Sequence, residues 1–157
     1  MSSSTPATRA LIAAGVAVDL HHYDYDPQDQ QIAIAAALAL GEPPGRVLKT
    51  LIIFADEKPG CVLVPADREV KMKKAAAAFG AKAARMATVA EAERITGYKV
   101  GGVSPFGQKK ALRTFFERAV ESEPYVFVNG GQRGLQLKVT IETLQSVARA
   151  EVADLTG

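Results

Sequence analysis

The stretch VLKTLIIFADEKPGCVLV, residues 47–64, decides the fold of this chain. It contains two apolar runs, 47–54 and 61–64, which are rich in β-branched residues and are separated by a short polar segment. Runs of this kind predict two β-strands. The Pro59-Gly60 dipeptide between them is typical of a turn. The sequence therefore predicts an antiparallel hairpin.

The segments around this hairpin show helical and extended patterns in mixed order. Helices are expected at 5–15, 31–40, 69–79, 88–96 and 140–148, and further strands at 16–25, 113–117, 125–128 and 135–139. Thr88, followed three residues later by Glu91, predicts a capping box at the start of the fourth helix. We therefore expect a single α/β domain over 1–157, with a mixed sheet or a partly open barrel surrounded by helices.

Composition limits the classes of function. The chain has 157 residues, 48% of them apolar, which suits one compact domain. No apolar run approaches the ~18 residues of a membrane span, and the N-terminal stretch lacks the pattern of a secretory signal, so a cytoplasmic protein without a membrane partner is expected. One cysteine and two adjacent histidines predict no disulfide, metal site or other cofactor. A net charge of +2 permits an RNA partner without demonstrating one, and we expect no DNA partner.

Several familiar motifs fail on closer reading. The acidic stretch 24–29 lacks the glycine and the glutamate that a calcium-binding loop requires. The run 102–109 lacks the Gly-Lys-Ser/Thr ending of a P-loop. Cys61 opens an apolar strand without a neighbouring base, which favours a buried structural thiol over a nucleophile. Ser104 lies in no nucleophile elbow. A hydrolase built from this chain would use neither a conventional protein nucleophile nor a metal.

The dipeptide Lys49-Thr50 lies inside the first apolar run of the hairpin. A lysine flanked by Leu48 and Leu51 is costly to remove from water unless its charge is used. It is either an edge-strand lysine whose ammonium reaches solvent, or a cation that projects into a pocket and holds a phosphate or a carbonyl oxygen.

Each of two glycine-rich segments can be interpreted in two ways. Residues 97–110 contain Gly101-Gly102 and, after them, Pro105, which would stiffen the loop. The glycine pair forms either a tight turn or a loop whose N–H groups bind an anion or oxyanion. Residues 128–135 form either a hairpin turn or a loop that lines the same pocket with Arg133. Scattered basic residues form either a solvated face or a phosphate-contacting rim; these are Arg68, Lys71, Lys73, Lys74, Lys109, Lys110 and Arg113.

Taken together, these segments resemble the YbaK family of bacterial Cys-tRNA(Pro) deacylases, which are related to the editing domain inserted into bacterial prolyl-tRNA synthetases. The likeness covers essentially the whole chain, and the run 101–110 is its most specific part. The matching residues, in family order, are His21-His22-Tyr23-Asp24, Asp26-Pro27, Leu48-Lys49-Thr50-Leu51, Lys73-Lys74-Ala75, Thr96-Gly97-Tyr98, Gly101 to Lys110 and Gly130 to Leu135.

The resemblance implies a fold and an activity. The fold would be a six-stranded mixed sheet that forms a partly open barrel with surrounding helices. The activity would be trans-editing, the removal of mischarged cysteine from Cys-tRNA(Pro), with Cys-tRNA(Cys) left open as a further substrate. In the family, the substrate thiol is thought to attack its own ester carbonyl and release a cyclic thiolactone, so no protein nucleophile is needed. The implied partners are the acceptor end of tRNA(Pro) and, transiently, prolyl-tRNA synthetase.

The same resemblance implies the site residues. Lys49, Gly101 and Gly102 are the candidate catalytic residues. Lys49 is assigned to the ribose–phosphate or carbonyl region of the substrate, and the glycine amides to oxyanion or backbone contacts. Tyr23 and Thr50 are assigned to the pocket walls. The full set of candidate substrate-binding residues is Tyr23, Ile32, Thr50, Ser104, Pro105, Asn129, Gly130, Gly131 and Arg133.

Two positions depart from the family pattern. Ile32-Ala33-Ile34-Ala35 stands where members often carry an aromatic residue followed by Gly-Asp-Glu, and Asn129 stands where a serine is usual. The first region contributes to the amino-acid pocket, so two alternatives stay open. One is a deacylase for another small amino acid, as on Ala-tRNA(Pro). The other is a non-catalytic module that binds tRNA or the aminoacyl ester. The retained Lys49 favours the enzyme.

Overall fold

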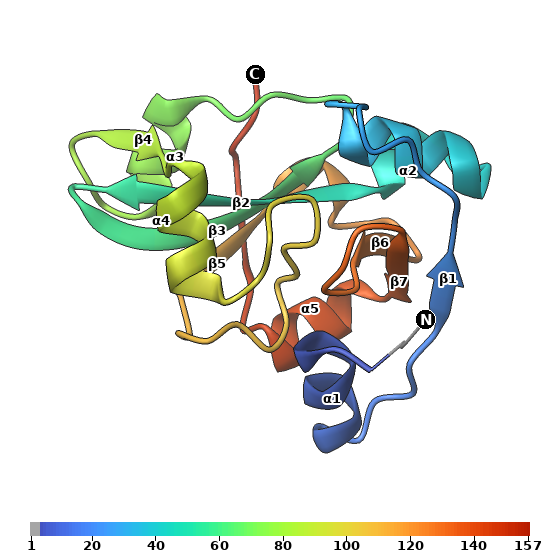
Figure 1. Ribbon diagram of the computed structural model, residues 1–157. Coiled ribbons are helices and arrows are strands. Elements are labelled where there is room, and N and C mark those ends of the chain that lie inside the picture. Colours follow the sequence, from blue (N-terminus) through green and yellow to red (C-terminus); the bar gives the residue numbers. More distant parts are fainter. Residues whose placement is uncertain (1–3) are drawn as a thin grey trace.

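The computed structural model describes residues 4–157 (Figure 1). Within this range the five α-helices are α1 (Pro6–Ala13), α2 (Ile32–Leu40), α3 (Met72–Ala78), α4 (Val89–Thr96) and α5 (Ile141–Val147). The eight strands of the same range are β1 (Leu20–His22), β2 (Leu48–Ala55), β3 (Lys58–Pro65), β4 (Ala84–Met86), β5 (Thr114–Glu117), β6 (Val126–Asn129), β7 (Leu135–Val139) and β8 (Glu151–Ala153). Two 3-10 helices, η1 (Pro44–Arg46) and η2 (Arg118–Val120), complete the elements. None of the described helices has the length and apolar character needed to cross a bilayer.

The larger sheet is built on the predicted hairpin. β2 pairs antiparallel with β3 along its whole length, from Leu48 opposite Pro65 to Ala55 opposite Lys58. The strand order is β4-β2-β3-β5-β8, and the β3–β5 and β5–β8 pairs are parallel. Among the described residues, β4 pairs only with 53–55 of β2. The first half of β2 therefore forms a free edge of the sheet.

The smaller sheet has the order β1-β7-β6, with both pairs antiparallel. A parallel bridge between Val47 and Phe127 connects the start of β2 to β6. The mixed α/β class and the partly open form are therefore confirmed. The resemblance implied one sheet of six strands. Within residues 4–157 the strands instead form a sheet of five and a sheet of three, because a single bridge between Val47 and Phe127 is too little pairing to make them one sheet.

The hairpin turn lies earlier in the chain than the sequence predicted. Asp56 and Glu57 occupy it with positive φ angles of 47° and 63°, the conformation of a tight hairpin turn. Pro59 and Gly60 lie within β3 instead. A Cβ atom on Gly60 would lie 2.5 Å from the ring of Phe79, so this glycine is needed for packing against a distant residue.

Most of the predicted helices and strands are confirmed apart from small differences at their ends, and Thr88 and Glu91 form the predicted capping box of α4. The strand expected at 16–25 is shorter, because only the three residues of β1 pair with β7. β4 and β8 were not predicted. Each has three residues, which is too short for an alternating pattern to appear in the sequence.

The helix α3 begins at Met72, three residues later than predicted. The residues before it are held extended by the C-terminal end of the chain. Lys71 N–H donates to the carbonyl oxygen of Leu155 (2.8 Å), and Val70 forms an isolated bridge with Thr156. Contacts between residues far apart in sequence therefore override the local helical pattern.

The core lies on both faces of the larger sheet. The inner face of β2 contributes Leu48 and Ile52 to a cluster that also includes residues of α1, α4, α5 and the smaller sheet. The other face contributes Ile53 to a cluster beneath α3. Figure 1 shows α1 and α5 together at one end of the molecule and α2 beside the start of β2. Successive residues of β2 therefore face different surroundings.

A buried carboxylate fastens the C-terminal residues to this core. Glu117, at the end of β5, is 3% exposed and accepts hydrogen bonds from the N–H groups of Ala119 (2.7 Å), Leu155 (2.8 Å) and Thr156 (3.0 Å). Burial by itself raises the pKa of this carboxyl, but these hydrogen bonds together outweigh burial, and the pKa lies below its usual value. Glu117 is therefore ionised at neutral pH.

We expect Glu117→Gln to lower the free energy of unfolding at neutral pH by about 1–3 kcal/mol, because it removes the charge and one acceptor. Since the folded-state pKa is lowered, the stability from the ionised group is lost as the pH falls from ~4.3, the unfolded value, through the folded pKa. Denaturant unfolding from neutral pH down to about pH 3 should show the gap between wild type and variant closing in acid. A gap that stays constant would contradict this assignment.

Candidate active site

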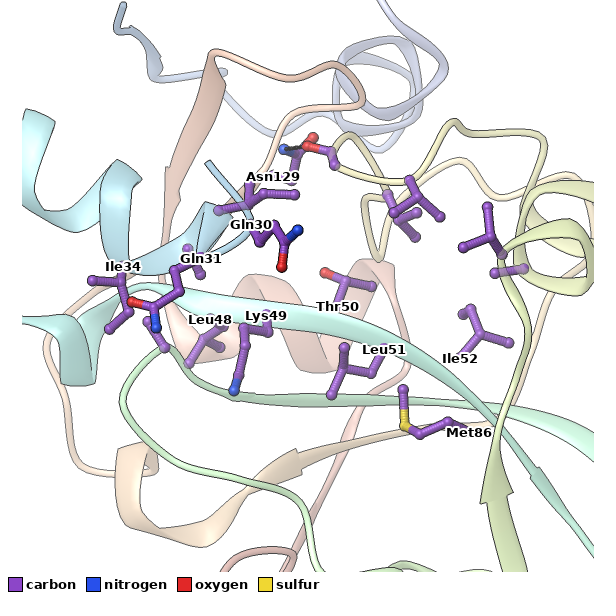
Figure 2. A pocket seen from close by; sticks show the side chains of 18 of the residues that line it. Gln30, Gln31, Ile34, Leu48, Lys49, Thr50, Leu51, Ile52, Met86 and Asn129 are labelled. Atoms are coloured by element: carbon purple, nitrogen blue, oxygen red, sulfur yellow. Dashed lines mark hydrogen bonds between the residues drawn. The ribbon is translucent and has the colours of Figure 1, made fainter. Parts of the chain in front are cut away.

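A cavity of about 630 Å³ opens at the free edge of β2 (Figure 2). Residues 48–52 of β2 form one wall, and the start of α2 with the residues before it forms another. The first glycine loop and the segment that leads into α4 face them. The lining residues used below are Ile32, Lys49, Thr50, Gly101, Asn129 and Gln136.

Lys49 and Thr50 both line this cavity but project from opposite faces of β2, as Figure 2 shows. Lys49 Nζ donates to the carbonyl oxygen of Arg68 (2.6 Å) and lies 3.5 Å from a carboxylate oxygen of Glu69. The lysine side chain is 21% exposed. The cation is therefore held by a backbone carbonyl at the free edge of β2 and stays within reach of solvent.

Two polar atoms of the cavity wall are buried and have no hydrogen-bond partner among the described residues: Thr50 Oγ1 and Gln136 Oε1. A buried polar atom without a partner is costly, so each is a candidate contact for a bound ligand. The sequence had not predicted Gln136 as a site residue. Its one signal is a polar side chain inside the buried strand β7.

Most of the predicted glycine amides are already used inside the protein. Three of them shape their own loops: Gly102 N–H donates to Lys99 O (2.8 Å), Gly130 N–H to Leu135 O (2.8 Å) and Gly131 N–H to Asn129 Oδ1 (2.7 Å). The predicted oxyanion role is therefore not supported for these three. Gly101 N–H has no partner within residues 4–157, and Gly101 lines the cavity. Of the four, its N–H group alone has no acceptor among the described residues.

Asn129 connects the two glycine loops. Its Nδ2 donates to the carbonyl oxygen of Gly101 (3.0 Å), while its Oδ1 accepts from Gly131 N–H. A Cβ atom on Gly102 would lie 2.8 Å from Cα of Gln132, so the loops touch backbone to backbone. The glycines therefore allow close approach, and Asn129 fixes the position of Gly101 in the cavity wall.

Arg133 positions part of the wall and does not enter the cavity. Its guanidinium donates to the carbonyl oxygens of Asp26 (3.0 Å), Pro27 (3.2 Å) and Asp29 (2.6 Å), just before the cavity residues Gln30-Gln31. Its two terminal nitrogens are therefore engaged with the chain, whereas Nε is buried without a partner among the described residues, and direct contact with substrate stays a prediction. We assign Arg133 to holding the 26–29 segment.

The other predicted site residues also fall into two groups, those that line the cavity and those that lie outside it. Ile32, Thr50 and Asn129 line the cavity with Lys49. Tyr23 borders a second hollow next to Arg133, but its buried hydroxyl lies beside Gln136 of the cavity wall, and burial raises the pKa of its phenol. Ser104 and Pro105 are buried inside the first glycine loop and do not line the cavity, and Ser104 Oγ accepts from Phe106 N–H (3.3 Å).

The described lining of the cavity lacks the residue types that form a conventional protein nucleophile and its base. No cysteine, serine or histidine is among its described lining residues. Cys61 is fully buried in β3, and burial raises the pKa of its thiol to about 12, so it is neutral. In the described part of the chain, no group of three or more His, Cys, Asp or Glu side chains is arranged to hold a metal ion. The site offers the cation of Lys49, the backbone N–H group of Gly101, neutral polar atoms and the carboxylates of Asp67 and Glu69.

Comparisons with known proteins agree with this arrangement. Residues 29–147 match the model of the aminoacyl-tRNA editing domain family. The chain is 32% identical over 130 residues to "Putative Cys-tRNA(Pro)/Cys-tRNA(Cys) deacylase EbsC" of Enterococcus faecalis (strain ATCC 700802 / V583), covering 82% of this chain and 79% of that protein. It is 29% identical over 153 residues to the proline–tRNA ligase of Nitratidesulfovibrio vulgaris (strain Hildenborough), a match that spans 98% of this chain and 25% of the ligase.

A solved structure supports the same relationship. The crystal structure of "a putative trans-editing enzyme for prolyl tRNA synthetase" superposes with a TM-score of 0.85 at 28% identity and covers 99% of both chains. The match over residues 29–147, with these relatives, shows that the chain is an enzyme domain that edits aminoacyl-tRNA. The chain belongs to the aminoacyl-tRNA editing domain family and is a deacylase of the YbaK type, which confirms the family predicted from its motifs.

Proposed function

We propose that this protein is a trans-editing deacylase that removes cysteine from Cys-tRNA(Pro) by attack of the substrate's own thiol. The observation that carries the proposal is a cavity with a cation and a free backbone donor whose described lining residues include no cysteine, serine or histidine. The E. faecalis relative is named as a putative deacylase of Cys-tRNA(Pro) and Cys-tRNA(Cys), and this name supports the choice of cysteine. A reaction that takes its nucleophile from the substrate needs only positioning and charge stabilisation from the protein.

In the proposed step, the cysteinyl sulfur bonds to the ester carbonyl carbon, and negative charge develops on the carbonyl oxygen. Collapse of this intermediate breaks the bond between that carbon and the ribose oxygen. The ribose oxygen takes up the proton that the thiol released. The products are the deacylated tRNA and a cyclic thiolactone, so all atoms and charges balance.

The two faces of β2 divide the proposed roles. Gly101 N–H donates to the developing oxyanion, inside the cavity. The Thr50 hydroxyl donates to or accepts from the aminoacyl group, and Gln136 Oε1 accepts a hydrogen bond from it, because both atoms are buried and lack a partner among the described residues. Lys49 projects from the other face of β2. Of the two assignments predicted for it, this placement favours contact with the ribose–phosphate backbone over contact with the carbonyl.

Selectivity for tRNA(Pro) is proposed to come from transient association with prolyl-tRNA synthetase. The net charge is only +2, and four basic residues are engaged in contacts within the protein. Lys74 pairs with Asp154, Arg113 with Glu151 and Arg118 with Asp154, and Arg68 donates to Thr156. A small domain with a net charge of only +2 has little surface with which to read tRNA identity.

The decisive experiment compares deacylation of Cys-tRNA(Pro), Ser-tRNA(Pro) and Ala-tRNA(Pro) under the same conditions. We expect cysteine to be released at least about 10-fold faster than serine, because a hydroxyl is a poorer internal nucleophile of nearly the same size. Faster release of alanine would show that Ile32 has retuned the pocket and that water attacks the ester. No release from any of the three would favour the non-catalytic binding module.

A further inference from the structure

We propose that Leu155 and Thr156, close to the C-terminus, are positioning residues for Lys49, an inference that rests on the deacylase function proposed above. The ammonium of Lys49 is held by the carbonyl oxygen of Arg68 (2.6 Å), in the segment that joins β3 to α3. Within the segment itself, one turn bond fixes this residue, from Arg68 N–H to Pro65 O (3.0 Å). The rest of its support comes from elsewhere in the chain.

The C-terminal residues supply that support. Arg68 Nη1 donates to Oγ1 of Thr156 (3.2 Å), and Lys71 N–H donates to the carbonyl oxygen of Leu155 (2.8 Å). Val70 forms an isolated antiparallel bridge with Thr156. Figure 1 shows the C-terminus ending beside the segment that precedes α3. The carbonyl that holds Lys49 is therefore fixed across the chain by residues that follow β8.

These residues are themselves anchored in the core. Leu155 is fully buried and Thr156 is 4% exposed. Both N–H groups donate to Glu117 Oε1, and Lys74 Nζ donates to the carbonyl oxygen of Thr156 (2.7 Å). Thr156 thus binds Glu117 through its N–H group and the Arg68 guanidinium through Oγ1, while the backbone carbonyl of the same Arg68 accepts from Lys49.

This connection matters because Lys49 is at a free sheet edge. A lysine side chain has four rotatable bonds, and its ammonium must be held within about 0.5 Å of its productive place to act on substrate. The neighbouring Glu69 lies 3.5 Å away and its carboxylate is largely exposed, so it holds the ammonium weakly. Movement of the Arg68 carbonyl would therefore release the cation.

A pair of variants at Thr156 tests the proposal. Thr156→Val keeps the shape of the side chain but removes Oγ1, and Thr156→Ser keeps Oγ. We expect Thr156→Val to lower kcat/KM for Cys-tRNA(Pro) by about 3- to 10-fold, and Thr156→Ser to stay within about twofold of wild type.

Asp56→Asn is the matched control for general loss of stability. Asp56 also accepts hydrogen bonds from backbone N–H groups, those of Lys82 (3.1 Å) and Ala83 (3.1 Å), but it lies in the turn at the far end of β2. We expect this variant to lose stability and to keep its activity per folded molecule.

Hydrogen exchange of the lysine ammonium groups, followed by ¹⁵N NMR, gives a readout that does not depend on activity. The Lys49 signal is assigned by its loss in Lys49→Met. Exchange at Lys49 should be several-fold faster in Thr156→Val than in wild type, Thr156→Ser or Asp56→Asn. Unchanged exchange would overturn the positioning role, and so would faster exchange with unchanged deacylation. A wild-type protein that releases no amino acid would contradict the deacylase function instead, and the exchange rates would still decide whether Thr156 holds Lys49 in place.

Discussion

Lys49→Met should slow deacylation of Cys-tRNA(Pro) by about 100-fold, because Lys49 is proposed to hold the ribose–phosphate backbone, and a misplacement of the ester by about 1 Å can cost that much in rate. The fold should be unaffected. The Lys49 side chain is partly exposed at a free sheet edge, and its removal leaves only the Arg68 carbonyl to be hydrated. Single-turnover rates with saturating enzyme, together with thermal unfolding, would separate the two effects.

Lys73→Met is the control for the change in net charge. Lys73 is exposed on α3 and forms no ion pair within the part of the chain that the structure describes. We expect its rate to stay within about twofold of wild type, since a distant solvated charge adds little. Equal losses in the two variants would mean that Lys49 acts only through general attraction of tRNA. Full activity in a folded Lys49→Met variant would remove the lysine from the mechanism.

Lys49 and Thr50 project from opposite faces of β2, so the charged group and the neutral polar groups of the site lie on different sides of that strand. Alternation along β2 puts the cation on one face and Thr50 on the other, where Figure 2 also shows Asn129. The charged part of the substrate and its aminoacyl group can therefore be held on opposite faces of one strand. The free edge of β2 makes this possible, because β4 pairs only with the far end of that strand in the described structure.

The sequence predicted the hairpin because long apolar runs carry a strong local signal. It misplaced the turn because Pro59-Gly60 is a typical turn dipeptide, while the actual turn uses Asp56 and Glu57 in left-handed conformations. Gly60 serves the packing of Phe79, which local sequence cannot show. The start of α3 was misplaced for the same reason, because distant C-terminal residues hold Lys71 and the residue before it in extended conformation.

The candidate site was predicted in part. Lys49 and the glycine loops stand out as residue types that carry chemistry, and the resemblance placed them together. The sequence could not predict which glycine N–H groups are available to a ligand. That depends on whether an acceptor elsewhere in the chain already binds the N–H group in the folded protein. The N–H groups of Gly102 and Gly131 donate to acceptors in their own loops, whereas the N–H group of Gly101 has no acceptor among the described residues. Gln136 was missed because one polar residue in a strand is common.

Gly102→Ala should damage both stability and catalysis. Its Cβ atom would lie 2.8 Å from Cα of Gln132 and 3.1 Å from the backbone nitrogen of Arg133. Backbone cannot move aside as a flexible side chain can, so the two glycine loops must separate. We expect a loss of about 1–3 kcal/mol in the free energy of unfolding, as for overpacking in a core. The shift should also move Gly101, and a displacement of about 1 Å can cost up to about 100-fold in rate.

Gly45→Ala provides the matched control, because a Cβ atom there meets nothing within 4 Å. Its stability and rate should remain close to those of wild type. Denaturant unfolding and single-turnover deacylation of both variants would give the comparison. If Gly102→Ala lost stability but kept its full rate per folded molecule, the Gly101 N–H group would have no part in the reaction. The carbonyl oxygen would then need another donor, and the unpartnered hydroxyl of Thr50 would be the next group to replace.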